Sequence, residues 1–258
     1  MSGLELPIHL MRDRAEVFGT VAEQYDRLRP SSPDALVDDL LALRPTRVLD
    51  VGAGTGKAAR LLAARGLDVL GVEIDAEMAA VARTHGLAVE VGAFETWDAA
   101  GRTFDLITCG QAWHWIDPSA GLIKALSVLD PGGWLVPFWN YGQVPESLRA
   151  AFDEIYDRIA PHLMRSVAYA ASQRGVRIGA WEQDPRLAST QLREYSWRHV
   201  YPAADWLALL QTHSDHVLLD VDVRERLLAE LGTEIDRHGG LVDLQYTTFA
   251  AFAQKARP

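Results

Sequence analysis

The chain is 258 residues long, with 48% hydrophobic and 23% charged residues, so it can bury a substantial core and is expected to fold as a globular protein. Its net charge of -10 and the absence of any run rich in lysine or arginine argue against nucleic acid as a partner, because binding a phosphate backbone usually requires a basic patch. The single cysteine, Cys109, excludes an internal disulfide, and the charged N-terminal segment 1–18 is not typical of a signal peptide. No apolar run approaches the roughly 20 residues that cross a membrane. We therefore expect a cytoplasmic protein that does not bind membranes.

The first 140 residues show a regular alternation of patterns. Apolar residues at helical spacing predict N-terminal helices within residues 1–44. From residue 45 onward, short apolar runs alternate with helical stretches, which predicts βαβ units and a parallel sheet with helices on both faces. The predicted strands are Arg47–Val51, Leu67–Val72, Ala88–Val91, Phe104–Cys109 and Trp134–Trp139. The predicted helices between them are Thr55–Arg65, Ala76–His85 and Pro118–Leu129.

After Asn140 the alternation stops. Here the patterns predict a helix over Pro145–Leu163, an irregular segment 165–187, a strand over Gln191–Val200, helices over Ala204–Thr212 and Arg224–His238, and a last strand beginning near Val242. We expect one domain in four parts: N-terminal helices (1–44), a cofactor-binding core (45–140), a cap inserted before the last two strands (141–190), and C-terminal strands and helices (191–258).

The strongest motif in the chain runs from Val48 to Gly56, with the sequence VLDVGAGTG. Its three glycines let the backbone turn tightly and approach a ligand closely, and the helix that follows offers free N–H groups. A phosphate-binding GxxxxGK[ST] loop is excluded, because Val51 stands at its first glycine position and Ala58 at its last position. The GxGxxA pattern of a dinucleotide-binding loop fits Gly54–Ala59, so this alternative stays open.

Two carboxylates beside the glycines bear on the choice of ligand. Asp50 precedes Gly52 by two residues, where it can hold the loop and pair with an amino-acid ammonium group, which NAD lacks. Glu73 lies at the end of the second predicted strand, where a carboxylate can accept both ribose hydroxyls. No arginine follows Glu73, so a 2′-phosphate is not expected.

The segment Asp50–Gly56 together with Glu73 resembles the S-adenosylmethionine (SAM) signature of the class I methyltransferases. The chain resembles the type 11 methyltransferases, near the trans-aconitate methyltransferase-like group, over roughly residues 15–140. Besides the glycine motif, the resemblance rests on Phe18–Pro33, Phe104–Ile107, Gln111–Trp115 and Leu129–Gly133. It implies an α/β fold with a Rossmann-like, seven-stranded, mostly parallel sheet sandwiched by helices and carrying an inserted helical cap. It also implies SAM-dependent methyl transfer to a small-molecule acceptor.

The resemblance assigns cofactor-binding roles to individual residues. Gly52, Ala53, Gly54 and Gly56 are expected to line the methionine and ribose part of SAM, with Asp50 supporting the loop. Glu73 is expected to bind the ribose and Ile74 to pack on the adenine.

Other cofactor roles depend on departures from the family pattern or on less specific positions. Many relatives carry an acidic residue after the third strand. This chain has Ala93 and Phe94 there, so backbone groups and the Phe94 ring are expected to contact the adenine, with Glu95 as a substitute acid. Gln111 is expected at the mouth of the cofactor site, and Tyr25 and Arg29 are expected to close over the SAM carboxylate.

A second group of residues follows the fourth and fifth strands, at the sheet edge where ligands of such folds bind. Its members are predicted to line the acceptor site: Trp113, His114, Trp115, Trp139, Asn140 and Tyr141. His114 is the candidate general base, with an acceptor-orienting or a purely structural role as alternatives. His199, His213 and His216 show no convincing metal-ligand spacing with a nearby carboxylate, so no metal is expected.

Two rival functions remain open: an NAD-dependent oxidoreductase, and a catalytically silent SAM-binding protein. The sequence does not distinguish methylation at oxygen, nitrogen or carbon, nor a monomer from a homodimer.

Overall fold

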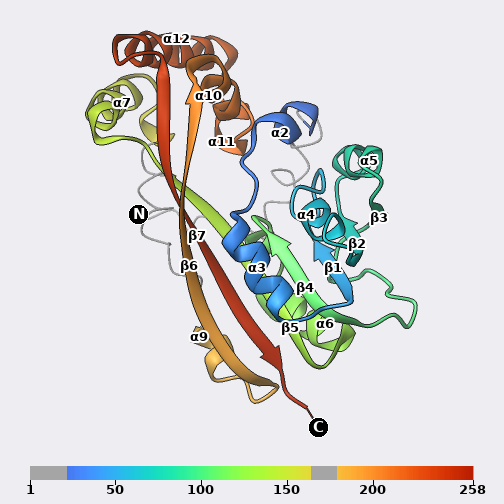
Figure 1. The fold of residues 1–258 in the computed structure, drawn as a ribbon. Coiled ribbons are helices and arrows are strands. Elements are labelled where there is room, and N and C mark those ends of the chain that lie inside the picture. Colours follow the sequence, from blue (N-terminus) through green and yellow to red (C-terminus); the bar gives the residue numbers. More distant parts are fainter. Residues whose placement is uncertain (1–21, 164–178, 258) are drawn as a thin grey trace, which may run out of the picture.

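A seven-stranded sheet forms the centre of the computed structural model, which describes residues 22–163 and 179–257 (Figure 1). The strand order is β3-β2-β1-β4-β5-β7-β6. The strands are β1 (Arg47–Val51), β2 (Asp68–Glu73), β3 (Ala88–Val91), β4 (Phe104–Gly110), β5 (Leu129–Gln143), β6 (Leu187–Pro202) and β7 (Leu241–Lys255). Neighbours among β1 to β5 are parallel, whereas β7 is antiparallel to both β5 and β6. The predicted mostly parallel, seven-stranded α/β fold is confirmed.

Helices cover the sheet and gather at one end of it (Figure 1). They are α2 (Ala22–Leu28), α3 (Asp34–Ala42), α4 (Ala59–Ala63), α5 (Ala76–Thr84), α6 (Pro118–Val128), α7 (Glu146–Ile159), α9 (Gly179–Glu182), α10 (Ala203–Leu210), α11 (Ser214–Val217) and α12 (Val221–Arg237), with a short 3₁₀ helix at Trp113–Trp115. Asp75, Asp117 and Asp220 begin α5, α6 and α12 by accepting hydrogen bonds from backbone N–H groups of the first turn, which explains where these helices start. Within the described ranges, no helix combines the length and apolar character needed to span a bilayer.

β5 and β6 are longer than the sequence predicts, whereas β7 begins at Leu241, next to its predicted start. β5 extends from Leu129 to Gln143, and β6 and β7 pair along almost their whole lengths in an antiparallel ribbon. The predicted strand Trp134–Trp139 is too short, because β5 begins at Leu129 and includes Pro131–Gly133 with a register shift against β4. The extended ends of the ribbon project beyond the parallel strands and carry α7, α10 and α12 (Figure 1).

The cap is assembled from two separate stretches of chain. Helices α7, α10 and α12 bury a common core that includes Leu148, Phe152, Trp206, Leu227 and Leu231. The expected cap boundary at residue 190 therefore differs from the structure, because α10 and α12 belong to the connection between β6 and β7. The expected helices within residues 1–21 and most of the irregular segment 165–187 lie outside the described residues.

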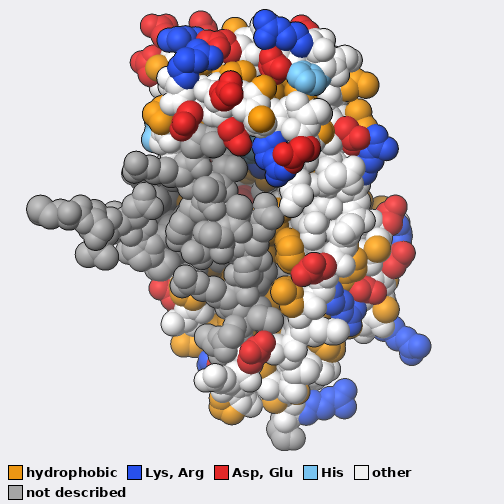
Figure 2. All heavy atoms as spheres, turned by 90° about the vertical axis from the view of Figure 1, so that its left-hand side faces the viewer, with side chains coloured by type: hydrophobic (Ala, Val, Ile, Leu, Met, Phe, Trp, Pro, Cys, Tyr) orange, Lys and Arg blue, Asp and Glu red, His pale blue; other side chains and the backbone are white. Residues whose placement is uncertain are grey.

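The outer surface of the cap carries charges of both signs. Figure 2 shows acidic and basic side chains interspersed over the upper end of the molecule, where Figure 1 places α7, α10 and α12. Arg158 on α7 pairs with Glu230 on α12 in this region. Exposed pairs of this kind contribute at most about 1 kcal/mol each, so the cap is held mainly by its apolar core.

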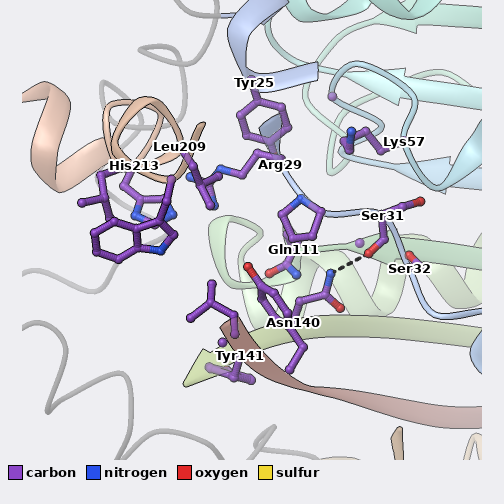
Figure 3. Close-up of a pocket in the computed structure, with 18 of the residues that line it drawn as sticks. Tyr25, Arg29, Ser31, Ser32, Lys57, Gln111, Asn140, Tyr141, Leu209 and His213 are labelled. Atoms are coloured by element: carbon purple, nitrogen blue, oxygen red, sulfur yellow. Dashed lines mark hydrogen bonds between the residues drawn. The ribbon is translucent and has the colours of Figure 1, made fainter. Parts of the chain in front are cut away.

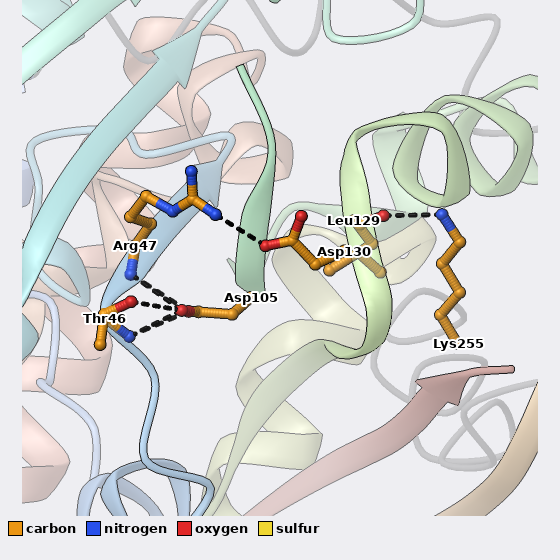
Figure 4. Close-up of polar contacts among 6 residues, drawn as sticks. All are labelled: Thr46, Arg47, Asp105, Leu129, Asp130 and Lys255. Carbon is orange, nitrogen blue, oxygen red and sulfur yellow. Dashed lines mark hydrogen bonds and ion pairs between the residues drawn. The ribbon is translucent and has the colours of Figure 1, made fainter. Parts of the chain in front are cut away.

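A network of polar contacts lies at the amino-terminal ends of β1 and β4 (Figure 4). The Asp105 carboxylate accepts the backbone N–H groups of Thr46 and Arg47, and the Thr46 hydroxyl donates to it at 2.6 Å. Arg47 pairs with Asp130 at 2.8 Å, and Lys255 donates to the Leu129 carbonyl at 2.6 Å. These contacts fix the edge of the sheet opposite to the glycine motif.

Candidate functional site

The loop after β1 has a backbone that requires glycine. Gly52, Gly54 and Gly56 have φ values of +64°, +55° and +82°, in the left-handed region. The N–H groups of Gly52 and Ala53 donate to the Val72 carbonyl at 2.8 and 3.1 Å, which fastens the loop to β2. A Cβ atom on Gly52 would lie 2.4 Å from the Cβ of Ala112. The loop therefore sits against the segment that follows β4.

Gly56 has a different task from the one expected. It lines neither of the two large cavities described below, and a Cβ atom there would lie 2.2 Å from Leu87 Cδ1. Its missing side chain makes room for packing under the loop. The helix was predicted to begin at Thr55, but α4 begins at Ala59. The positive φ of Gly56 is not helical, so the helix can begin only after this residue.

Two cavities meet at the carboxyl-terminal edge of the parallel strands. The first, the β2-side cavity, has a volume of about 330 Å³. Its own lining includes Glu73, Ile74, Met78, Ala93, Phe94, Glu95, His114 and Trp115. The second, the cap-side cavity, has a volume of about 510 Å³. Its own lining includes Ser31, Asp50, Asn140, Tyr141, Phe152, Tyr156, Trp206, His216 and Tyr246.

Eight residues line both cavities and so mark their boundary: Tyr25, Arg29, Gly52, Gly54, Gly110, Gln111, His213 and Asp215. Figure 3 shows Tyr25 and Arg29 beside each other and the Arg29 side chain directed toward His213. The Arg29 guanidinium donates to the hydroxyl and the carbonyl of Thr212, both at 2.9 Å. Gln111 has a φ of +62°, which is uncommon for a residue with a side chain and is typical of strained backbone at ligand sites.

Glu73 fastens the glycine loop from the end of β2. Its carboxylate accepts the N–H of Gly54 at 2.7 Å and that of Asp75 at 2.9 Å. A carboxylate has about four lone-pair positions, so Glu73 keeps acceptor capacity for ligand hydroxyls. Burial raises its pKa despite these two donors.

Asp50 is a buried carboxylate on β1 beneath the loop. It accepts a hydrogen bond from the Thr108 hydroxyl at 2.7 Å, and burial raises its pKa to about 7. A buried acid of this kind becomes ionised easily once a cation approaches. The geometry thus keeps Asp50 suited both to supporting the loop and to receiving a cationic group from the cap-side cavity.

Comparison with known proteins agrees with this arrangement. Residues 49–136 match the family described as methyltransferase domain. They form a methyltransferase domain. The chain is 40% identical over 134 residues to an uncharacterized methyltransferase of Mycobacterium tuberculosis, an alignment that covers 50% of this chain and 54% of the relative. The match thus spans about half the length of that curated relative.

Other similarities extend over more of the chain. A trans-aconitate 2-methyltransferase of Mycobacterium tuberculosis is 29% identical over 204 residues, covering 72% of each chain. A structure from Anaeromyxobacter dehalogenans, named as a candidate type II methyltransferase, has a TM-score of 0.61 at 21% identity and covers 89% of this chain and 99% of its own. The phosphoethanolamine N-methyltransferase 2 of Haemonchus contortus, solved with S-adenosyl-L-methionine, has a TM-score of 0.56 at 17% identity and covers 98% of this chain and 61% of its own. These structural likenesses show that the fold is that of the class I methyltransferases.

The aromatic segment of the methyltransferase domain is arranged differently from the prediction. Trp113 and Trp139 were expected in the acceptor site, but neither lines the β2-side cavity or the cap-side cavity. Trp113 is buried in the core against Phe94 and Trp181, because the 3₁₀ helix turns its ring under the sheet edge. His114 and Trp115 line the β2-side cavity, the one that also contains Glu73.

His114 is poorly placed to act as a base toward an acceptor in the cap-side cavity. Its Nδ1 already accepts the indole N–H of Trp139 at 3.1 Å, so in the neutral ring the proton resides on Nε2. Such an imidazole presents a donor, not an acceptor, on its remaining nitrogen. Burial also lowers the pKa of His114 to about 4. We therefore withdraw the general-base role and retain His114 as a neutral hydrogen-bond donor that lines the cavity.

The state of His114 leads to a prediction about stability. In the unfolded chain His114 takes up a proton below about pH 6.5, whereas in the folded chain it stays neutral down to about pH 4. The free energy of unfolding therefore falls as the pH drops from 6.5 to about 4. His114→Gln, which still offers an acceptor to Trp139, should lack this loss. Denaturant unfolding at about pH 7 and about pH 5 should show that the difference in free energy of unfolding between wild type and variant shifts by about 2 kcal/mol in favour of the variant at the lower pH. An unchanged difference would place the His114 pKa near its ordinary value.

Asn140 and Tyr141 lie at the end of β5 where they were expected, on the wall of the cap-side cavity (Figure 3). The Asn140 amide donates to the Ser31 carbonyl at 3.1 Å and accepts from the Thr248 hydroxyl at 2.7 Å. Asn140 is therefore held in one orientation and ties the loop before α3 to β7.

Sequence reasoning missed the cap side of the site. His213 and His216 do lie with a carboxylate, that of Asp215, and their ligand atoms are within 4.8 Å of one another. Tyr156 from α7 joins this group. The spacing His-x-Asp-His was a signal in the sequence, but nothing local indicated that α7 would meet it.

Proposed function

We propose that the chain binds SAM in the β2-side cavity and transfers its methyl group to a small molecule held in the cap-side cavity. The observation that carries the proposal is the shared boundary between the two cavities, where the glycine loop, Gln111, Arg29 and His213 face both. A group bound in one cavity can meet a molecule bound in the other without crossing the protein. Positioning of two reactants in this way supplies a large part of the rate enhancement when no covalent catalysis is needed.

The residues of the β2-side cavity fit the parts of SAM. Glu73 would accept the ribose hydroxyls, and the adenine would lie between Ile74 and the segment containing Ala93 and Phe94. Gly54 lines both cavities and presents no side chain, which leaves space for the ligand along the loop. The bound sulfonium would supply an already activated methyl group, so the chain's own task is to orient the acceptor and to exclude water.

The amino-acid end of SAM would reach the boundary between the cavities. Asp50, on the cap-side wall next to this boundary, offers a carboxylate for the ammonium group, and Tyr25 and Arg29 lie on the shared wall, where the carboxylate of SAM would bind. The Arg29 guanidinium is 5.1 Å from the centre of the Tyr25 ring, so the two side chains form one surface. Arg29 is also held by Thr212 of the cap, and this contact links the cofactor site to the acceptor site.

Calorimetric titration with SAM, S-adenosylhomocysteine and NAD tests this function. We expect dissociation constants in the micromolar range for the first two, equivalent to roughly -8 kcal/mol, and no heat of binding with NAD. Binding of NAD alone would favour the oxidoreductase alternative. Binding of SAM without methyl transfer to any tested acceptor would favour a silent SAM-binding protein.

The raised pKa of Asp50 predicts that SAM binding releases a proton. Near pH 6 Asp50 is largely protonated in the free protein, and the SAM ammonium group should drive it to ionise. The heat of binding should therefore differ between two buffers of different ionisation enthalpy, by an amount approaching one proton per ligand. Asp50→Asn should abolish the buffer dependence, whereas Asp68→Asn, at an exposed carboxylate on β2, should keep it. Equal heats in both buffers would contradict the pairing of Asp50 with the ammonium group.

A further inference from the structure

A chain of hydrogen bonds lies in the wall of the cap-side cavity. The Asp215 carboxylate contacts Nδ1 of His216 at 2.9 Å, and Nε2 of the same ring contacts the Tyr156 hydroxyl at 2.8 Å. His216 and Tyr156 are only 4% and 8% exposed, yet both line the cavity. Asp215 comes from α11 and Tyr156 from α7, so the chain spans both stretches that build the cap.

The chemistry of the three groups fixes the direction of these hydrogen bonds. Burial alone would raise the pKa of Asp215, but the hydrogen bonds that its carboxylate accepts from the side chain and the backbone N–H of His216 hold it well below its ordinary value. An ionised carboxylate can only accept, so His216 donates from Nδ1, and the lone pair of Nε2 accepts the Tyr156 hydroxyl. Burial raises the pKa of Tyr156, so its phenol keeps its proton and donates it in this bond. The Tyr156 oxygen retains lone pairs for an acceptor in the cavity.

We propose that Tyr156, His216 and Asp215 form a proton relay that serves an aromatic hydroxyl acceptor in the cap-side cavity. This proposal rests on the proposed methyltransferase function. A carboxylic acid is already ionised near neutral pH and has no need of such a relay, whereas a phenol does. Aromatic side chains line the cavity in which the acceptor would bind. The rings of Phe152 and Trp206 stack with their centroids 5.1 Å apart, and Tyr246 lines the same cavity.

The charges that face the relay also favour an acceptor that becomes an anion. Arg29 lies next to the cluster, close enough for its charge to contribute to the lowered pKa of His213, and it lines the same cavity. The His213 ring packs edge-on against the His216 ring, with the two ring centroids 5.8 Å apart. Burial and Arg29 keep His213 uncharged, and the other ionisable side chains of the cavity wall include Arg149, Asp50, Asp153 and Asp215. The Arg29 guanidinium would stabilise a phenolate that forms beside it.

The proposed reaction moves one proton along the relay and conserves all electron pairs. The acceptor hydroxyl gives its proton to the Tyr156 oxygen while the Tyr156 proton moves to Nε2 of His216, and the resulting imidazolium is stabilised by Asp215. The electron pair left on the acceptor oxygen forms the new bond to the methyl carbon, and the pair of the broken carbon–sulfur bond stays on sulfur. His216 later returns its proton to solvent.

A metal ion is a less suitable explanation of the same cluster. Both nitrogens of His216 are already occupied by hydrogen bonds within the protein, and Arg29 adds a positive charge beside them. A cation would have to displace Tyr156 or Asp215 from His216 and to bind next to a guanidinium. The hydrogen-bonded arrangement is therefore the favoured one.

Binding of 4-nitrophenol tests the relay without knowledge of the natural acceptor. The chromophore is titrated into protein saturated with S-adenosylhomocysteine, at about one pH unit below its pKa in water, and the absorption band of its phenolate is recorded. We expect the band to grow on binding to the wild type. His216→Gln and Tyr156→Phe should each lower the ratio of bound phenolate to bound phenol at least about tenfold. His199→Gln, at an exposed histidine on β6, should leave the ratio unchanged.

The outcomes separate the relay from the proposed function. No binding of the chromophore, no phenolate band in the wild type, or an unchanged band in a folded His216→Gln protein overturns the relay. Loss of the band on addition of a chelator to the wild type also overturns it, in favour of a metal ion. If His216→Gln fails to fold, Tyr156→Phe decides, because it removes one oxygen atom and keeps the ring. Failure of S-adenosylhomocysteine to bind in calorimetry counts against the proposed function, whereas its binding without phenolate formation counts against the relay alone.

Discussion

Replacing Gly52 by alanine is expected to lower the free energy of unfolding by about 2–6 kcal/mol and to weaken S-adenosylhomocysteine binding severely. One part of the loss is backbone strain, since φ is +64° at this position and a residue with a Cβ pays roughly 1–3 kcal/mol there. The other part is a collision with Ala112 at 2.4 Å, which neither partner can relieve by rotating a side chain. Overpacking of this kind costs about 1–3 kcal/mol more.

Gly66→Ala is the matched control for this prediction. Gly66 also has a positive φ, of +85°, but a Cβ atom there meets nothing within 4 Å. It should therefore show the strain alone, a loss of about 1–3 kcal/mol, with S-adenosylhomocysteine binding intact. Denaturant unfolding and calorimetry on the two variants give both quantities. Equal destabilisation by the two substitutions would mean that the glycine loop does not pack on the Ala112 segment.

Glu73→Ala is expected to weaken S-adenosylhomocysteine binding about 100-fold or more. The variant removes the charged acceptor for the ribose hydroxyls, and it also leaves the N–H groups of Gly54 and Asp75 without their partner. Each hydrogen bond from a ribose hydroxyl to a charged acceptor contributes about 1.5–3 kcal/mol, and about 1.4 kcal/mol corresponds to a tenfold change in affinity. Loss of the two internal hydrogen bonds should in addition lower the free energy of unfolding, because the Gly54 loop loses its attachment to the end of β2.

Two further variants identify the cause of this loss. Glu73→Gln keeps one oxygen acceptor and should fall between wild type and Glu73→Ala. Glu77→Ala removes an exposed carboxylate from the first turn of α5 and should bind like the wild type. If calorimetry gives the same dissociation constant for wild type and a folded Glu73→Ala protein, Glu73 is not part of the cofactor site.

The sequence was sufficient for the half of the site that is built from local motifs. The strands β1 and β3 have the predicted bounds, because each is a short apolar run between clear turn signals. Gly52, Gly54 and Glu73 meet because the ends of adjacent parallel strands necessarily share one edge of the sheet. The order of patterns along the chain was therefore enough to bring these residues together.

The cap-side half could not be predicted in the same way. Tyr156 and His216 are 60 residues apart, and their hydrogen bond depends on how α7 and α11 pack at the end of the long β5–β7–β6 ribbon. Neither the length of that ribbon nor the packing of its helices is encoded in a local pattern. The tryptophans could not be placed from the sequence either. A ring that follows a strand can line a ligand site or fill the core, and Trp113 fills the core.

The role of His114 depended on a contact that sequence proximity does not reveal. The indole of Trp139, 25 residues further along the chain, occupies the nitrogen that a base would need. The candidate for proton transfer consequently moves from the β2-side cavity to His216 in the cap-side cavity. A tautomer is set by the partner of the second ring nitrogen, and that partner is known only from the tertiary structure.

A crystal structure of the chain with S-adenosylhomocysteine is the most direct test of the proposal that the cofactor binds in the β2-side cavity and the acceptor in the cap-side cavity. We expect the ribose hydroxyls on the Glu73 carboxylate, the adenine between Ile74 and Phe94, and the sulfur at the boundary formed by Gly54, Gln111 and His213. The cap-side cavity should remain open in front of the sulfur, bordered by Tyr156 and His216. A ligand whose ribose lies away from Glu73, or whose sulfur faces away from the cap-side cavity, would contradict the account.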